Sequence, residues 1–137
     1  DEGSGVYLGK ELVKGMVRKK FSYPIVTKFY NAYDITENDL ISKIYAQPRV
    51  NQYLASLVPF IKENIEEKAI EKLIENSFTA YFQNYIQPVI KYKNADIVNI
   101  VGGIANTFAS QLKRVLNTHY VEVEIIDSPM NKILTRF

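Results

Sequence analysis

A short apolar run followed by two glycines, near the end of the chain, constrains the fold more than any other feature. Residues 97–101 read IVNIV and are followed at once by Gly102 and Gly103. A run this short and this rich in β-branched residues is typical of a buried strand. Apolar residues at helical spacing over 104–116 then predict a helix, and residues 121–125 alternate apolar residues with glutamate, as a second strand does. The order strand, helix, strand predicts a parallel, right-handed crossover.

Almost all of the chain before residue 96 has the pattern of amphipathic helices. Pro24 fits the first turn of a helix, and Thr36 fits the position just before one. We expect Pro48 and Pro88 to end helices, and Pro59 to kink or split one. The predicted buried positions are Leu8, Leu12, Val13, Met16 and Val17; Ile25, Phe29 and Ala32; Leu40, Ile41, Ile44 and Tyr45; Tyr53, Leu54, Leu57, Val58, Ile61 and Ile65; and Ile70, Leu73, Ile74, Phe78, Tyr81, Phe82 and Tyr85.

Composition excludes several classes of function. A chain of 137 residues with 47% apolar residues is expected to form one domain or part of one. The formal charge of +2 does not indicate a nucleic-acid partner. The absence of cysteine excludes disulfides, thiolate metal sites and cysteine nucleophiles, and it fits a reducing compartment. No apolar run reaches the roughly 20 residues that span a bilayer, so we expect a soluble, cytoplasmic protein without a membrane partner.

The remaining chemistry-bearing residues are best interpreted as structural. Residues 62–75 alternate glutamate and lysine as solvated helix faces do, so no metal site is expected there. Most tyrosines and phenylalanines fall on the helical stripes and indicate core packing. His119, the single histidine, is expected at the surface. The chain has no HExxH, no Walker lysine loop and no GxGxxG, which disfavours zinc proteases, P-loop enzymes and dinucleotide-binding domains.

Two glycine-containing segments are the candidate ligand sites. Asp1-Glu2-Gly3-Ser4-Gly5 opens the chain, and Gly102-Gly103 follows the predicted strand. Each places flexible backbone and free amide groups where a helix begins, which suits a sugar hydroxyl or a phosphate. For the glycine pair alone, a tight turn that serves packing is an equal alternative. Because the chain begins without methionine inside the first candidate loop, we expect it to be part of a larger protein.

Several landmarks occur in a characteristic order over nearly the whole chain. DEGSG at the start is followed by Tyr7-Leu8-Gly9, then by YAQPRVNQYLASLVPF at 45–60, IVGGIAN at 100–106 and Asp127-Ser128-Pro129. In this order they resemble the C-terminal half of the N-acetylglucosamine kinase and BadF/BadG/BcrA/BcrD ATPase family. DEGSG combined with the later landmarks is more specific than the glycine pair alone.

The resemblance implies a helix-rich α/β fold within the actin-like ATPase, or hexokinase-type, architecture. Its two lobes are built on ribonuclease H-like sheets, and ATP lies in the cleft between them. Residues 1–137 would form most of the second lobe, with a helical part over about 4–93 and a βαβ part over about 96–137.

The resemblance also implies the ligands and the residues that face them. Asp1 would accept hydrogen bonds from sugar hydroxyls, and Glu2, Gly3 and Ser4 would support that loop. Gly102 and Gly103 would lie against the nucleotide, with Ile104, Ala105 and Asn106 as weaker neighbours. ATP would transfer its γ-phosphoryl group to a sugar hydroxyl with the help of magnesium and an aspartate base. That base and the main magnesium ligand belong to the first lobe, so no catalytic or metal-binding residue is expected in this sequence.

Two other functions remain open. One is a BadF-type ATPase, whose cysteine-ligated iron–sulfur cluster has no counterpart in this cysteine-free chain, so only a cluster-free form fits. The other is a non-enzymatic helical interaction module whose glycine turns are only structural. The expected partners are a small-molecule sugar and ATP, and the oligomeric state, including a homodimer, is left open.

Overall fold

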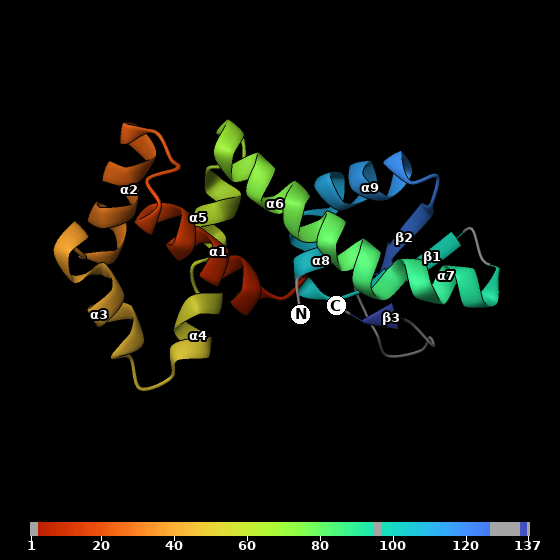
Figure 1. Cartoon of the computed structure of the whole chain (residues 1–137), viewed down its shortest axis with the longest axis horizontal. Coiled ribbons are helices and arrows are strands. Elements are labelled where there is room, and N and C mark those ends of the chain that lie inside the picture. The colour runs from red at the N-terminus through yellow and green to blue at the C-terminus, as the bar shows by residue number, and fades with distance from the viewer. Residues whose placement is uncertain (1–2, 95–96, 127–134, 137) are drawn as a thin grey trace. The chain divides into compact units, whose positions relative to one another are not determined.

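The computed structural model describes residues 3–94, 97–126 and 135–136. Contacts within the chain group into two compact units (Figure 1). The helical unit is Gly5–Leu73, and the sheet unit is Ile74–Phe137 together with the first four residues. The predicted helical part, about residues 4–93, contains the whole helical unit and continues beyond it.

The helical unit consists of short helices joined by tight turns (Figure 1). These are α1 (Gly5–Val17), α2 (Tyr23–Tyr33), the 3₁₀ helix η1 (Glu37–Asp39), α3 (Leu40–Tyr45), α4 (Val50–Ala55), α5 (Val58–Glu63) and the first part of α6 (Lys68–Tyr81). Helix α1 packs against α4 and α5, and α3 packs against α4. The sequence therefore predicts the helical character of this region correctly.

The turn between α2 and α3 follows the predicted capping chemistry. Asp34 ends α2 in the left-handed conformation, with φ of 51°. Thr36 caps η1 in a capping box, and its backbone N–H donates to Asp39 Oδ1 at 2.7 Å. These bonds from Thr36 lower the pKa of the Asp39 carboxyl below its usual value. The prediction of Thr36 as a helix N-cap is confirmed.

Prolines divide the helices of this unit as expected. Helix α3 ends before Pro48, at Tyr45. Of the two outcomes expected at Pro59, the structure has the split: α4 ends at Ala55, and α5 begins with Pro59 in its first turn. A proline is tolerated there because first-turn N–H groups have no partner within the helix.

The core of the helical unit is narrower than the apolar pattern predicts. Val17, Ile41 and Tyr45 are about half exposed, although all three were expected to be buried. Helix α3 has only six residues and buries one face, through Leu40 and Ile44, so the flanking apolar positions stay in solvent. The buried apolar side chains of the helical unit are Leu8, Leu12, Val13, Met16, Ile25, Phe29, Ile35, Leu40, Ile44, Leu54, Leu57, Phe60, Ile61 and Ile70.

The sheet unit contains a three-stranded parallel sheet in the order β2-β1-β3. The strands are β1 (Ile97–Val101), β2 (Glu122–Ile126) and β3 (Thr135–Arg136). Strand β1 pairs in parallel with both neighbours, and Ile97 lies opposite Glu122. The predicted parallel strand-helix-strand unit is confirmed. Strand β3 was not predicted, because a segment of two residues is too short to show a periodic pattern. The predicted landmark at residues 127–129 lies outside the described residues.

Helix α6 does not stop at Pro88. It continues through the π-helical turn η2 (Phe82–Ile86) into α7 (Gln87–Lys93), where Pro88 occupies the first turn. The N–H of Gln87 donates to the carbonyl of Phe82, five residues back, as in a π-helix. In this wider turn the pairing of backbone N–H groups with carbonyls changes just before Pro88. Pro88, which has no N–H to donate, is therefore accommodated without ending the helix.

The helix predicted over 104–116 is two helices. Helix α8 (Gly103–Thr107) and α9 (Ala109–Thr118) meet at Phe108, which leaves the helical conformation with φ of −116° and ψ of 37°. Phe108 is fully buried and its ring packs edge-on against Phe78, with centroids 6.4 Å apart. Helix α9 packs on β2. The buried apolar residues of this unit are Ile74, Phe78, Tyr81, Phe82, Ile86, Ile100, Ala105, Phe108, Leu112, Val115, Leu116, Val121 and Val123.

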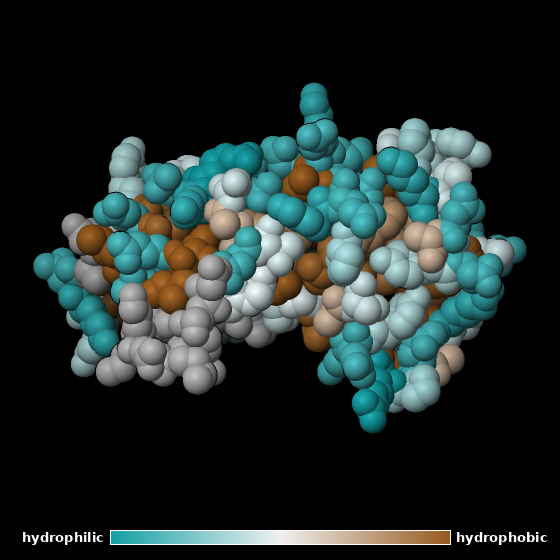
Figure 2. All heavy atoms as spheres, turned by 180° about the vertical axis from the view of Figure 1, so that it is seen from behind, coloured by the Kyte–Doolittle hydropathy of each residue, from teal (hydrophilic) through white to brown (hydrophobic). Residues whose placement is uncertain are grey.

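On the face shown in Figure 2, hydrophilic residues cover much of the surface and apolar residues show between them. Among the described residues, the large hydrophobic or aromatic side chains with the highest exposure are three tyrosines. Tyr23 is 81% exposed, Tyr92 is 89% exposed and Tyr120 is 94% exposed. Within the part of the chain that the structure describes, no helix is both long and apolar enough to cross a bilayer.

Candidate functional site

The opening segment DEGSG is described from its third residue onward. Gly3 is buried and Ser4 is half-buried, and both belong by their contacts to the sheet unit. Helix α1 begins at the next residue, Gly5. Asp1 and Glu2, the first two predicted sugar-binding residues, lie outside the described residues.

The two glycines that follow this loop have packing partners. A Cβ at Gly9 would lie 2.1 Å from the carbonyl oxygen of Leu54 in α4, a distance that no real Cβ can adopt. A Cβ at Gly5 would lie 3.5 Å from Ala55 and Val58, at ordinary contact distance. Gly9 is therefore required by the packing of α1 against α4.

The predicted nucleotide turn lies between β1 and α8. Gly102 precedes the helix with φ of 146° and ψ of 157°, a conformation that essentially only glycine adopts. The N–H of Asn106 donates to the Gly102 carbonyl at 3.1 Å, and the Thr107 hydroxyl donates to the Gly103 carbonyl at 2.7 Å. A Cβ at Gly103 would meet no heavy atom within 4 Å. Backbone conformation thus explains Gly102, whereas neither packing nor a left-handed φ explains Gly103.

The three residues after the glycine pair differ in exposure. Ala105 is fully buried, so its methyl group belongs to the core and its backbone is not exposed to a ligand either. Ile104 and Asn106 are half-buried. The described parts of both candidate segments, Gly3 and Ser4 on one side and residues 102–106 on the other, belong to the same compact unit.

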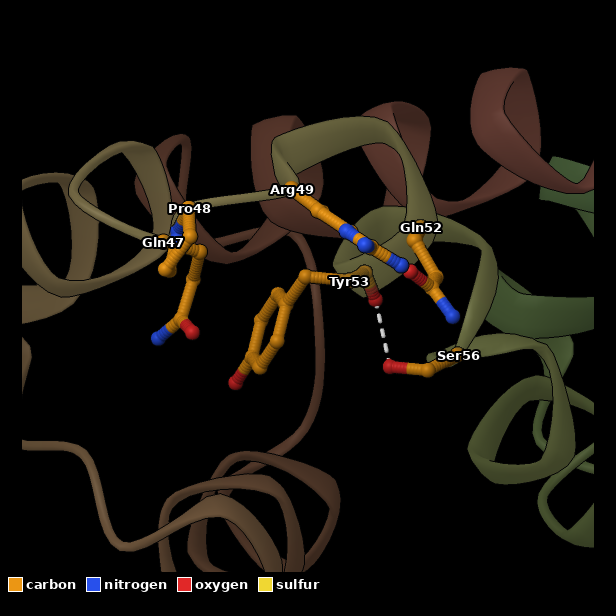
Figure 3. Close-up of a pocket in the computed structure, with 6 residues that line it drawn as sticks. All are labelled: Gln47, Pro48, Arg49, Gln52, Tyr53 and Ser56. Atoms are coloured by element: carbon orange, nitrogen blue, oxygen red, sulfur yellow. Dashed lines mark hydrogen bonds between the residues drawn. The ribbon is translucent and has the colours of Figure 1, made fainter.

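A groove of about 470 Å³ lies in the helical unit, and none of the residues that line it is a predicted site residue (Figure 3). All six residues that line it come from the landmark at 45–60: Gln47, Pro48, Arg49, Gln52, Tyr53 and Ser56. The Ser56 hydroxyl donates to the Tyr53 carbonyl. Arg49 forms no ion pair with any residue that the structure describes. Sequence reasoning treated this landmark only as a family signature, and nothing in its residue types indicated a groove.

A second groove, of about 480 Å³, shares Gln47 and Tyr53 with the first and extends to Tyr33 and Lys43. Lys43 Nζ donates to the Asp34 carbonyl at 3.0 Å. Burial raises the pKa of the Tyr33 phenol, and the nearby Tyr53 and Glu63 raise it further. Burial also raises the pKa of Tyr53. Both rings therefore stay neutral at physiological pH.

Among the residues that the structure describes, no group of three or more histidine, aspartate or glutamate side chains is arranged to hold a metal ion. The predicted glutamate-rich face over 62–75 has structural contacts instead. Glu75 pairs with Arg114 at 3.0 Å, and Glu67 accepts hydrogen bonds from the first turn of α6.

No protein-family model matches the chain, and no curated protein is significantly similar to it. A solved structure is similar: a protein of Porphyromonas gingivalis described as a "putative N-acetylglucosamine kinase". The two structures agree with a TM-score of 0.83 and 26% sequence identity. The similarity covers 95% of this chain but only 46% of the P. gingivalis chain. The resemblance to the N-acetylglucosamine kinase-like family that the sequence predicts is therefore confirmed by a solved structure.

Proposed function

We propose that this chain is part of an ATP-dependent sugar kinase that transfers the γ-phosphoryl group of ATP to a hydroxyl of a hexose or amino sugar. The observation that carries the proposal is the similarity, over 95% of the chain, to the P. gingivalis protein. Because the chain spans less than half of that protein, the activity is proposed for the complete protein and not for these residues alone.

The chain would form most of the second lobe of a two-lobed, ribonuclease H-like fold. The parallel order β2-β1-β3, with α8 and α9 in the crossover, supports an α/β lobe of this type. ATP and sugar would bind in the cleft between this lobe and the first.

The sugar would bind at the opening loop. An aspartate carboxylate accepts hydrogen bonds from neighbouring hydroxyl groups, and Asp1 would do so here. Glu2, Gly3 and Ser4 would hold that loop in place, and α1 follows them directly.

The nucleotide would bind at the turn after β1. The open space at Gly103 supports this assignment, because a ligand can approach a backbone without a side chain more closely than any other. The backbone of Gly102 and Gly103 would contact the adenosine and phosphate groups, with Ile104 and Asn106 as neighbours.

Magnesium would neutralise charge on the phosphates. As the family resemblance implies, the metal ligands and the aspartate base would belong to the other lobe. The contribution of this chain would be to orient sugar and nucleotide and to exclude water when the lobes close. Positioning of this kind accounts for much of the catalysis in phosphoryl transfer.

A thermal-shift series on the complete protein tests the proposal, since a ligand that binds only the folded state raises the melting temperature. The kinase predicts stabilisation by ATP and by N-acetylglucosamine, each added alone. Stabilisation by ATP without any by sugars would favour the cluster-free ATPase. Stabilisation by neither would favour the interaction module.

A further inference from the structure

Helix α4 has a buried side and a polar side. Leu54 is fully buried, and α4 packs against α1. The polar side carries Arg49, Gln52, Tyr53 and Ser56, which run from the residue before the helix to the residue after it. Side chains three or four positions apart are neighbours on a helix surface, so these four residues form one continuous stripe. We call them the α4 stripe.

The α4 stripe lines the groove of about 470 Å³, together with the turn that precedes the helix. In Figure 3 the ring of Tyr53 lies between Gln47 and Ser56, and Arg49 extends toward Gln52. Tyr53 and Gln47 also line the neighbouring groove of about 480 Å³, so the two grooves are continuous. Grooves of this size accept small organic ligands.

Arg49 gives the groove a positive charge. Its side chain is exposed and pairs with no carboxylate of the described chain, and none of the six residues that line the groove is acidic. In the neighbouring groove, by contrast, Lys43 pairs with Asp39 at 3.6 Å. A guanidinium presents its N–H donors in a planar fork that matches a carboxylate or a phosphate. An anionic group would therefore bind at Arg49 and not at Lys43.

The other lining side chains suit a ring that carries hydroxyl groups. The amide nitrogen of Gln47 donates to the Lys43 carbonyl at 3.1 Å, which leaves the amide oxygen as an acceptor. The Ser56 hydroxyl donates to the Tyr53 carbonyl and keeps its own acceptor capacity. Tyr53 is half-buried and combines an apolar ring face with a phenolic donor.

We propose that this groove binds an anionic sugar, a pyranose that carries a phosphate or a carboxylate, with the anion on Arg49 and the ring against Tyr53. The proposal goes beyond the kinase activity, because none of the groove residues belongs to the proposed sugar loop or nucleotide turn.

The test is calorimetric titration of the complete protein, without ATP, with glucose 6-phosphate and with glucuronate. Glucose and inorganic phosphate, titrated separately, represent the two halves of the ligand. At least one anionic sugar should bind about tenfold more tightly than either half, and the tighter of the two identifies the anion. The proposal is overturned if neither anionic sugar binds, or if inorganic phosphate alone binds as tightly.

Substitutions in the α4 stripe locate the site. Arg49→Gln should weaken binding of the tighter sugar about tenfold or more, because charge-assisted hydrogen bonds are lost. Tyr53→Ala should also weaken it, whereas Tyr53→Phe keeps the ring and should retain most of the affinity. Arg49 is exposed, so its substitution should leave the melting temperature nearly unchanged.

Arg18→Gln is the matched control. Arg18 is also exposed and belongs to the same helical unit, but it lines neither groove. Its substitution should leave the affinity unchanged, as should Asp1→Ala in the proposed sugar loop. Equal weakening by Arg18→Gln and Arg49→Gln, or loss of binding in Asp1→Ala alone, would overturn the proposal. Failure of the kinase proposal is a separate result, because no ATP and no turnover enter these titrations.

Discussion

The imidazole of His119 stacks on the ring of Phe82, with ring centroids 4.3 Å apart and ring planes 17° apart. His119 follows the last residue of α9, and Phe82 is the first residue of the π-helical turn η2. His119, predicted as a surface residue, is half-buried and has a ring as packing partner. The stack joins the end of one helix to the irregular turn of another within the sheet unit.

Loss of this stack should destabilise the sheet unit. His119→Ala is expected to lower the free energy of unfolding by about 1 kcal/mol, the usual contribution of an aromatic pair. His119→Phe keeps a ring at the same place and should retain most of that stability. Urea denaturation of the three proteins measures the effect, and equal destabilisation by both substitutions would show that stacking contributes nothing.

Glu67 caps the first turn of α6. Its Oε2 accepts hydrogen bonds from the N–H groups of Ala69 and Ile70, at 3.0 and 3.1 Å. Glu67→Ala leaves both donors without this partner and should reduce stability by about 1 kcal/mol. Glu66→Ala, at the exposed neighbouring position, removes the same charge and should change stability by less than about 0.5 kcal/mol. A thermal unfolding curve for each variant makes the comparison, and the account of the cap is wrong if the two variants unfold alike.

Tyr81 should make stability depend on pH in the alkaline range. Burial, with a smaller contribution from Tyr85, raises the pKa of Tyr81 to about 12 from its ordinary value of 10.0. Between these two values the unfolded chain loses the phenolic proton while the folded chain keeps it. The unfolded state then binds fewer protons, so this contribution is complete below pH 10 and is lost as pH rises toward 12.

Melting temperatures measured across this pH range test the effect. Tyr81→Phe removes the ionisable group, so the difference in stability between wild type and variant should shrink as pH rises. Tyr30, Tyr33 and Tyr53 also have raised pKa values and are present in both proteins, so their effect cancels in the difference. A difference that stays constant with pH would contradict the burial of this phenol.

The two glycines after β1 should respond differently to alanine. Gly102→Ala forces a side chain into a backbone conformation with φ of 146° and should cost about 1–3 kcal/mol of stability. Gly103→Ala enters open space and should change stability by less than about 0.5 kcal/mol. In the complete protein, Gly103→Ala should nevertheless weaken ATP binding, because its methyl group occupies the proposed approach of the nucleotide. Calorimetric titration with ATP measures this, and unchanged affinity would identify the pair as a packing turn.

Helices and strands whose apolar pattern repeats over several residues could be predicted from the sequence. Apolar periodicity indicated the helices before residue 94, and the change of period at 97 indicated β1 and its parallel partner β2. What periodicity could not predict depends on contacts between distant residues. The break at Phe108 accompanies packing on Phe78, and the passage of the helix through Pro88 depends on a π-helical turn.

The candidate site was predictable only as a set of segments. The glycines are visible in the sequence, but their reasons are not: Gly9 is required by the Leu54 carbonyl, Gly102 by its backbone conformation, and Gly103 by neither. Pattern alone gives the three glycines equal weight. The structure distinguishes them because a close backbone contact depends on residues 45 positions apart in the chain, as Gly9 and Leu54 are.

The central claim is that the complete protein phosphorylates a sugar. The most direct measurement is ATP consumption with and without N-acetylglucosamine, together with mass spectrometry of the sugar. The account predicts consumption that depends on the sugar, a phosphorylated sugar product, and loss of both in Asp1→Ala. ATP hydrolysis that is indifferent to every sugar tested, or no use of ATP at all, would contradict it.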